Sequence, residues 1–270
     1  MEARSARAAP SVRALGAVNT LGLWTLYRKE VGRFLKVSFQ TVLAPMVSTL
    51  LFVIVFKLAI GANRTAPGGG DFTSFLAPGL VMMALLTNAF ANSASSILIA
   101  KVQGNAVDFL MPPLSPFELT AGFVAGAATR GIIVALAASV AASVLTDMTP
   151  SQIWAVLYFS LTGAVLFGAL GVLGGVAAFK FDHLAAVQNF VLLPLTFLSG
   201  TFYSSSAVPE AFRVLIHLNP VFYLIDGFRY GFTGRADGDL AIGAGLIGAL
   251  TAIAVFACRS AFARGWRLKA

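Results

Sequence analysis

A series of apolar segments, most of them about as long as a bilayer is thick, constrains this chain more than any other feature. A helix that crosses the hydrocarbon core needs about 20 mainly apolar residues. Charged residues make up only 11 % of the chain, whereas soluble domains contain about a quarter. The sequence therefore predicts an all-α membrane protein with six transmembrane helices, at approximately 39–60, 75–99, 115–145, 149–179, 184–198 and 240–262.

The basic residues predict the orientation of these spans. Lys and Arg are densest before residue 37 and recur after the sixth span, and cytoplasmic loops carry such an excess. With both termini in the cytoplasm, the basic residues that fall on the opposite side are Arg64, Arg213, Arg229 and Arg235. The net charge of +8 is neither striped on one face nor interleaved with polar aromatics, so we expect no nucleic-acid partner.

We expect one transmembrane domain over residues 1–270. Its parts are a cytoplasmic segment at 1–37, spans one to five within 38–198, an external hairpin at 199–235, the sixth span at 240–262 and a cytoplasmic tail at 263–270. In the first part, apolar residues from Leu23 to Phe34 fall near helical spacing and basic residues fall largely elsewhere. This pattern indicates an amphipathic helix on the cytoplasmic surface, and a plain positive anchor explains the charges equally well.

The hairpin between the fifth and sixth spans contains two apolar pieces of about ten residues, each too short to cross a bilayer. Pro209 and Pro220 each stand where a first helical turn can begin, and Asn219 can cap the second piece. We expect two short helices that re-enter the outer membrane face. Glu210, Asp226 and Arg229 either pair with one another there or are solvated at helix ends.

Helix caps and small residues give further expectations. Ser115 to Glu118 and Thr149 to Gln152 resemble capping boxes at the starts of the third and fourth spans, and a short helix fits residues 104–110 before the first of them. Close helix contacts are expected at two sets of glycines: Gly122 with Gly126, and Gly168, Gly171, Gly174 with Gly175.

Polar residues inside the spans are candidates for function. Asn88, Asn92 and Ser95 share one face of the second span, where they either hold neighbouring helices together or line a translocation path or dimer seam. Arg130 lies roughly 20 Å beyond the Ser115 cap, deep enough to need a partner or water. It serves either a structural pairing or the transport path.

Signatures of catalysis do not occur in the sequence. It contains no phosphate-binding loop of the form G-x-x-x-x-G-K-[ST], no H-E-x-x-H and no G-x-S-x-G. His183 has no His or Cys at ligand spacing, and Cys258 lies alone in an apolar segment. We therefore expect no catalytic residues, no metal site and no bound cofactor, and any ATP hydrolysis must occur on another subunit.

Several of these segments together resemble a known family. Ser199-Gly200, Pro209 and Pro220-Val221-Phe222-Tyr223, followed by Arg229, are similar to the signature of type-2 ABC transporter permeases, whose membrane fold is shared with the ABCG and ABCA transporters. The segments 27–35 and 126–131 resemble the bacterial YadH-like subgroup. The resemblance covers nearly the whole chain.

The resemblance implies a multi-pass protein of the bacterial inner membrane that forms a homodimer and binds two ATPase subunits, which carry ATP and Mg. It places the ATPase contact at Arg28, Lys29, Glu30, Arg33, Gln103, Gly104, Asn105, Asp108 and Phe109. The expected substrate path or dimer seam comprises Asn88, Asn92, Ser95, Arg130, Asn189 and Thr196. The expected external gate comprises Pro209, Glu210, Pro220, Tyr223, Asp226 and Arg229.

The implied function is export of an amphipathic substrate, such as a lipid, a lipid-linked glycan or a drug, driven by the separate ATPase. The Asn, Ser, Thr and Phe residues of the expected path suit such cargo, and membrane lipid is an expected partner. The alternative is a membrane-embedded lipid-modifying enzyme or an ATP-independent channel or scaffold. A neighbouring ATPase gene or a co-purifying ATPase separates these hypotheses.

Overall fold

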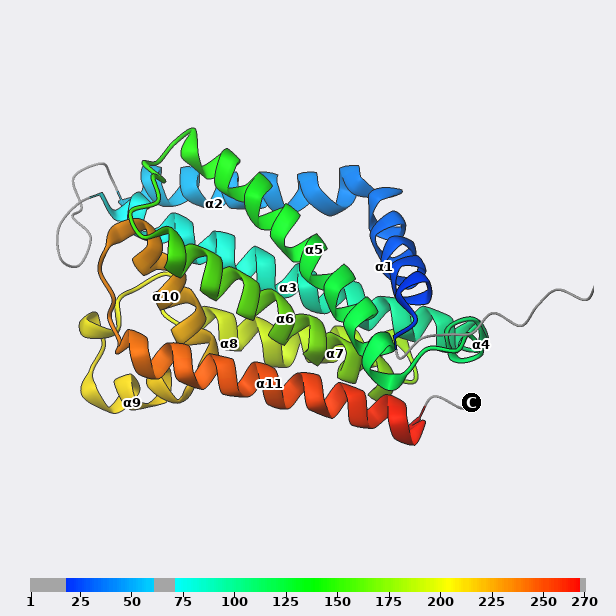
Figure 1. Ribbon diagram of the computed structural model, residues 1–270. Helices are drawn as coiled ribbons and strands as arrows, with labels where there is room; N and C mark the ends of the chain where they lie inside the picture. Colours follow the sequence, from blue (N-terminus) through cyan, green and yellow to red (C-terminus); the bar gives the residue numbers. More distant parts are fainter. Residues whose placement is uncertain (1–17, 61–70, 268–270) are drawn as a thin grey trace, which may run out of the picture.

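A computed structural model describes residues 18–60 and 71–267, and helices are the only regular elements in these two ranges (Figure 1). Arg64, residues 1–17 of the predicted cytoplasmic segment and residues 268–270 of the predicted tail lie outside them. The α-helices are α1 (Thr20–Leu35), α2 (Ala44–Ile60), α3 (Phe72–Val102), α4 (Val107–Leu110), α5 (Pro116–Ser143), α6 (Ile153–Ala177), α7 (Phe181–Val187), α8 (Leu193–Phe197), α9 (Glu210–Leu218), α10 (Pro220–Thr233) and α11 (Leu240–Arg264). Two π-helical segments, η1 (Phe39–Leu43) and η2 (Gln188–Leu192), and the 3₁₀ turn η3 (Ser205–Ala207) complete the described chain.

Five helices in the described ranges are long and apolar enough to cross a membrane: η1 with α2, α3, α5, α6 and α11. The all-helical class and five of the six predicted spans are therefore confirmed by length and composition. The predicted fifth span is divided into α7, η2 and α8, because its hydrogen-bond pattern changes to the π type between Gln188 and Leu192. Its crossing of the membrane stays a prediction.

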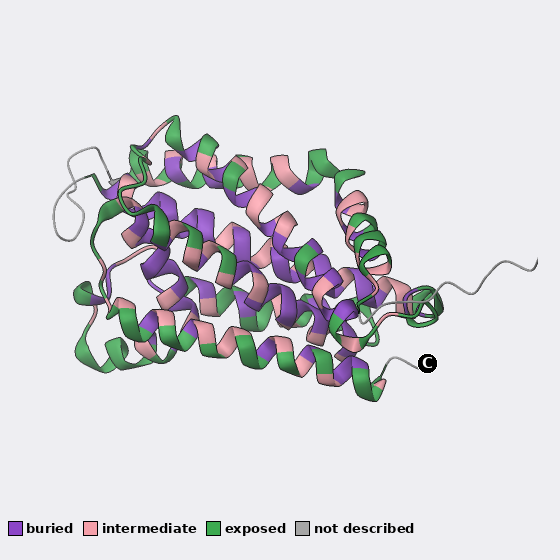
Figure 2. Ribbon diagram, in the orientation of Figure 1, coloured by how far each residue is buried: buried purple, intermediate pink, exposed green. Residues whose placement is uncertain are grey.

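Helix α3 is the centre of the bundle and packs against α2, α5, α6 and α10. Figure 2 shows buried residues concentrated along the inner helices, whereas α11 is exposed over much of its length. In the most apolar stretch of α3, 67 % of residues are buried, compared with 11 % in the first span. The apolar face that α2 leaves exposed is suited to lipid or to another subunit.

The close contact of α3 with α6 depends on glycine, as predicted. A Cβ added at Gly171 would lie 2.3 Å from the carbonyl oxygen of Phe90 and equally close to the Ser93 Oγ. Ser93 Oγ also donates a hydrogen bond of 2.7 Å to the Gly168 carbonyl oxygen, which joins a side chain of α3 to the backbone of α6. Any larger residue at Gly171 would force these helices apart.

The predicted capping box at Ser115 is confirmed. The Ser115 side chain accepts a hydrogen bond from the backbone N–H of Glu118, and the Glu118 carboxylate accepts one from the backbone N–H of Ser115 at 2.6 Å. The same carboxylate also accepts a hydrogen bond from the backbone N–H of Asn19, the residue that caps α1. One acidic side chain thus fixes the beginnings of two helices.

Loss of this cap should lower stability measurably. We expect Ser115→Ala to reduce the free energy of unfolding by about 1 kcal/mol, because an orphan N–H of α5 loses its acceptor. Denaturant unfolding in mixed micelles measures the change. Ser143→Ala, at the exposed other end of α5, is the matched control and should change stability by less than about 0.5 kcal/mol. Equal stability of the wild type and Ser115→Ala would contradict the role of the cap.

The second predicted capping box, at Thr149 to Gln152, is wrong. Helix α6 begins at Ile153, and its cap residue Gln152 makes no side-chain capping bond. The backbone N–H groups of Ser151 and Gln152 both donate to the carbonyl oxygen of Gly231 at 2.9 Å. A tertiary contact with α10 therefore replaces the local cap.

The short helix expected at 104–110 is also shorter than predicted, because α4 covers Val107–Leu110 alone. Gly104 adopts the left-handed conformation, with φ of +72°, and ends the long helix α3 one residue after its cap at Gln103. A turn then separates it from α4. The α3–α4 connection consequently projects from the same end of the bundle as α1 (Figure 1).

Candidate functional site

A groove with polar residues runs along the bundle between the first span, α3 and α5. Its volume is about 860 Å³. It combines hydroxyl, amide and guanidinium groups with apolar side chains, and its lining comprises Val37, Gln40, Thr41, Ala44, Pro45, Ser48, Thr49, Phe52, Leu80, Met83, Ala84, Thr87, Asn88, Ser95 and Arg130. We refer to this feature as the polar groove.

Arg130 and Asn88 face each other in the middle of the polar groove. Arg130 Nη2 donates a hydrogen bond of 3.1 Å to Asn88 Oδ1, and Asn88 Nδ2 donates to the Ala84 carbonyl oxygen at 3.0 Å. Arg130 has fourteen residues of α5 before it and thirteen after it, so it lies roughly 20 Å from either end. A guanidinium at this depth is expensive in lipid and usually marks a functional or water-lined position.

The stripe of Asn88, Asn92 and Ser95 divides between two environments. Asn88 and Ser95 line the polar groove, whereas Asn92 is fully buried and accepts hydrogen bonds from Arg33 of α1. Asn92 therefore holds α1 and α3 together, Asn88 faces the groove, and Ser95 does both, because it also accepts a hydrogen bond from Arg33. A translocation path or dimer seam along this stripe stays a prediction.

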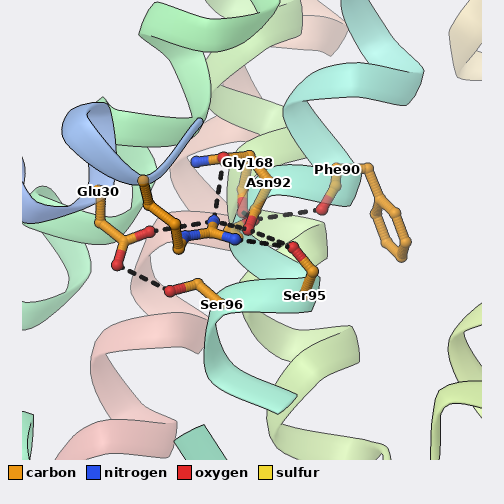
Figure 3. Close-up of polar contacts among 8 residues, drawn as sticks. Glu30, Phe90, Asn92, Ser95, Ser96 and Gly168 are labelled. Carbon is orange, nitrogen blue, oxygen red and sulfur yellow. Dashed lines mark hydrogen bonds and ion pairs between the residues drawn. The ribbon is translucent and has the colours of Figure 1, made fainter. Parts of the chain in front are cut away.

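Glu30 and Arg33 connect α1 to the C-terminal half of α3. Figure 3 shows Glu30 beside Asn92, Ser95 and Ser96 of that helix. Arg33 Nη2 lies 2.6 Å from the carbonyl oxygen of Asn92 and 3.3 Å from Glu30 Oε2, and Arg33 Nη1 donates to Ser95 Oγ at 3.2 Å. Glu30 Oε1 accepts a hydrogen bond of 2.7 Å from Ser96 Oγ. We call Glu30, Arg33, Asn92, Ser95 and Ser96 the α1–α3 polar cluster.

Two glycines of α5 let α1 approach closely enough for this cluster to form. A Cβ at Gly122 would lie 2.6 Å from Leu26 Cδ2, and a Cβ at Gly126 would lie 2.5 Å from Glu30 Cβ. Tyr27 and Thr129 add a hydrogen bond of 3.0 Å between their hydroxyl groups. The predicted helix contact at Gly122 and Gly126 is therefore confirmed, and its partner is α1.

The residues expected to contact an ATPase differ in their exposure to solvent. Arg28 and Lys29 are exposed on α1, and Gln103, Gly104, Asn105 and Asp108 are exposed at or near α4. Glu30 has no exposed surface, so it cannot touch a partner in this structure, and Arg33 is turned toward α3. Phe109 is buried against Phe123 with ring centroids 5.3 Å apart, which fixes α4 to α5.

A second groove lies between the start of α1 and the α4 segment. Its volume is about 460 Å³, and its lining includes Leu21, Thr25, Lys29, Asp108 and Phe109. The exposed residues of α1 and α4 thus form one continuous surface at this end of the bundle. The surface is held to the membrane helices by Glu118, Phe109 and the α1–α3 polar cluster.

The two predicted helices of the hairpin are present as α9 and α10, at the opposite end of the bundle from α1 and α4 (Figure 1). Pro220 is the first residue of α10, and the Asn219 side chain accepts a hydrogen bond from Val221, as predicted. Pro209 and Glu210 are exposed where α9 begins, and Tyr223 is half-buried against α11 through Gly243. The position of this hairpin in a membrane stays a prediction.

Solvation at helix ends, one of the two predicted environments for Asp226 and Arg229, is wrong, because both residues are buried and bind backbone groups. Their pairing across an external gate stays a prediction. Arg229 donates to the carbonyl oxygens of Phe75 at 3.1 Å and Gly200 at 2.6 Å, and its guanidinium lies 3.9 Å from the centre of the Phe75 ring. Asp226 accepts hydrogen bonds from the backbone N–H groups of Asp237 and Gly238. Burial raises the pKa of the Asp226 carboxyl, and these hydrogen bonds oppose the rise.

Asn189 and Thr196 do not join the polar groove. Asn189 is exposed on η2, and Thr196 is fully buried, where its carbonyl oxygen accepts hydrogen bonds from Ser199 and Thr201. Thr196 therefore organises the end of α8. Sequence reasoning also missed the groove residues Gln40, Thr41, Ser48, Thr49 and Thr87. The helical spacing of 41, 48 and 49 within an apolar span was the available signal.

Comparisons with known proteins agree with this architecture. The chain matches the ABC-2 type transporter family over residues 22–233. It is 36 % identical over 252 residues to the inner membrane transport permease YadH of Escherichia coli (strain K12), which covers 92 % of this chain and 97 % of that protein. It is 25 % identical over 258 residues to nodulation protein J of Bradyrhizobium diazoefficiens, covering 94 % of this chain and 96 % of that protein. The match to the family pattern and the identity to the permease together show that the chain belongs to the ABC-2 type transporter family.

Proposed function

We propose that this protein is the membrane-spanning permease subunit of an ATP-driven exporter that moves an amphipathic substrate. The ATPase is a separate subunit, which carries ATP and Mg, and two copies of it bind a homodimer of the permease. The whole chain acts as one membrane domain. The protein resides in the bacterial inner membrane, as the name of its Escherichia coli relative states for that protein.

The observation that carries this proposal is the connection between the exposed end of the bundle and the polar groove. Arg28 and Lys29 are exposed on α1, and less than two helical turns later Arg33 of the same helix bonds to Asn92 and Ser95. Ser95 lines the polar groove. A rigid displacement of α1 by a cytoplasmic partner would therefore be transmitted to the wall of the groove.

In this proposal both termini are cytoplasmic, α7, η2 and α8 together form the fifth of six spans, and α9 with α10 re-enters from the outer side. The arrangement in Figure 1 supports it, because α1, α4 and the end of α11 share one end of the bundle, while α9 and α10 lie at the other. Phe39 and Phe190 are about 80 % exposed on η1 and η2, which supports a second copy or lipid on these faces.

Charge reversal on α1 tests the partner. We expect the double variant Arg28→Glu/Lys29→Glu to weaken association with the ATPase subunit about tenfold or more, because both exposed basic groups would become repulsive. Co-purification of the permease with an ATPase that contains the phosphate-binding loop measures the effect. Arg213→Glu/Arg235→Glu, at the opposite end, makes the same change in charge and should leave association unchanged.

Two results would overturn the proposal. An active, purified permease that transports substrate at full rate without any ATPase would identify a channel, carrier or enzyme instead. Unchanged co-purification of the Arg28→Glu/Lys29→Glu variant would show that the exposed surface of α1 is not the contact.

A further inference from the structure

Arg130 is a cation without a counter-ion in the part of the chain that the structure describes. The ion pair found there joins Arg33 to Glu30, and it does not include Arg130. The one hydrogen bond recorded for the Arg130 side chain goes to the neutral amide of Asn88. Its Nε–H is buried and has no hydrogen-bond partner within residues 18–60 and 71–267.

Two other basic side chains of the bundle, those of Lys101 and Arg229, have partners. Lys101 Nζ donates to the carbonyl oxygens of Val176 at 2.6 Å and Ala178 at 2.7 Å, at the negative end of α6. Arg229 has the carbonyl oxygens of Phe75 and Gly200 and the Phe75 ring. Arg130 differs because it borders an open groove and keeps unused donors.

Within residues 18–60 and 71–267, a second copy of this chain offers no free carboxylate for Arg130. Among the described acidic residues, Glu30 packs against Gly126 of α5, four positions before Arg130, and it is fully buried and already bound to Arg33 and Ser96. The others lie at the ends of the long helices or in the loops and short helices between them: Asp71, Asp108, Glu118, Asp147, Asp182, Glu210, Asp226, Asp237 and Asp239. Among the described residues, neither this copy nor a second one supplies a counter-ion for Arg130, and a bound anion is the candidate that remains.

We propose that the polar groove binds the anionic headgroup of an amphipathic molecule, specifically a lipid whose phosphate headgroup carries a net negative charge, and that Arg130 is its headgroup-binding residue. A guanidinium matches phosphate oxygens in geometry and charge. Thr87 and Ser95 supply further hydroxyl groups, and Phe52, Leu80 and Met83 supply apolar surface for the acyl chains. The inference rests on the proposed function and narrows its substrate class.

The depth of Arg130 in the bundle indicates the stage of transport at which this site would bind a headgroup. A headgroup bound about 20 Å from either end of α5 is near the midplane, where a phosphate has lost its water and needs a fixed positive partner. Occupancy of this position is an intermediate stage of crossing. A site for resting membrane lipid would lie at the interface, where headgroups remain hydrated.

Headgroup selectivity of binding provides the test. Dioleoyl phosphatidic acid and dioleoyl phosphatidylcholine have the same chains, and their binding to the permease in neutral detergent can be compared by native mass spectrometry. We expect the wild type to prefer the anionic lipid at least tenfold. Arg130→Gln should abolish the preference, Arg130→Lys should retain part of it, and Arg259→Gln, an exposed arginine on α11, should leave it intact.

A second variant tests the effect of filling the polar groove without removing the charge of Arg130. Thr87→Phe keeps Arg130 and fills the polar groove, so it should reduce binding of phosphatidic acid at least tenfold while the protein elutes normally in size exclusion. Glycerol 3-phosphate, which has the same anionic group without chains, should not compete at millimolar concentration. Full competition would show that the site takes a free phosphate ester and would overturn the assignment of a lipid.

The inference and the proposed function fail in different ways. Equal affinity of the wild type for both lipids, or wild-type preference in Arg130→Gln, overturns the headgroup site even if ATP-driven export is observed. Failure to bind any ATPase, with the lipid preference and its loss in Arg130→Gln both present, overturns the exporter and leaves the lipid site standing.

Discussion

Replacing Arg229 by methionine is expected to destabilise the protein by about 3–5 kcal/mol and to prevent recovery of a monodisperse permease. The side chain is 2 % exposed and joins α10 to the start of α3 and to the loop after α8. Methionine fills a similar volume but removes the charged donor that Arg229 supplies to the carbonyl oxygens of Phe75 and Gly200. Each hydrogen bond from a charged group contributes about 1.5–3 kcal/mol, and loss of the contact with the Phe75 ring adds to this.

Denaturant unfolding in mixed micelles and yield in size exclusion measure this effect. Arg229→Lys should recover part of the stability, since an ammonium group reaches one carbonyl oxygen but cannot stack on Phe75 or bond to two separate segments at once. Arg235→Met, in an exposed loop, is the matched control and should change stability by less than about 0.5 kcal/mol. Wild-type stability of Arg229→Met with a loss of transport alone would instead support a role in the external gate.

Local sequence signals were sufficient wherever the determining partners are close along the chain. The start of α10 at Pro220 with its Asn219 cap, and the start of α5 at Ser115 with Glu118, each depend on residues within three positions of each other. The long helices were predictable from the length of the apolar segments, because a helix that crosses lipid needs an apolar composition over about 20 residues. These features need no knowledge of the tertiary fold.

Long-range contacts explain why some predictions from the sequence were wrong. Arg229 binds the carbonyl oxygen of Phe75, 154 positions away, and Glu30 binds Ser96, 66 positions away. The sequence is equally compatible with a solvated and with a buried position for the charged residues in these segments. It does not reveal which backbone groups of distant segments are free to form hydrogen bonds with them. The capping box expected at Thr149 failed for the same reason, since Gly231 supplies the acceptor.

The candidate site was partly predictable. The sequence places Asn88, Asn92 and Ser95 on one face of a helix, but that face is wide enough to meet both α1 and the polar groove. Arg33 of α1 donates a hydrogen bond to the Asn92 side chain, whereas the Asn88 side chain accepts one from Arg130. The position of α1 therefore decides which polar residues remain free to line the groove, and that position depends on Gly122 and Gly126 of α5.

Replacing Glu30 by alanine is expected to release α1 from α3 and to uncouple ATP hydrolysis from export. Glu30 is fully buried, and its removal leaves Arg33 without a counter-ion beside the polar groove that contains Arg130. Breaking one half of a fully buried ion pair costs about 3–5 kcal/mol, and the cost here is smaller because the Arg33 side chain keeps 29 % of its surface exposed. We expect transport to fall at least tenfold while the ATPase still binds through Arg28 and Lys29, which the substitution leaves exposed on α1.

The double variant Glu30→Met/Arg33→Met separates stability from coupling. Replacing a buried ion pair by apolar residues of similar volume is often neutral, so stability should return to within about 1 kcal/mol of the wild type. The hydrogen bonds of Arg33 to Asn92 and Ser95 remain absent in this variant. Transport measured per ATP hydrolysed in proteoliposomes should therefore stay low, because α1 is docked but no longer bonded to the wall of the groove.

Three outcomes of this experiment have distinct meanings. Recovery of both stability and transport in the double variant would show that packing of α1 through Gly122 and Gly126 is sufficient for coupling. Recovery of stability alone would assign coupling to the bonds that Arg33 makes with α3. Loss of ATPase binding in Glu30→Ala would contradict the separation of the two roles along α1, since binding would then depend on the buried face of the helix as much as on its exposed basic residues.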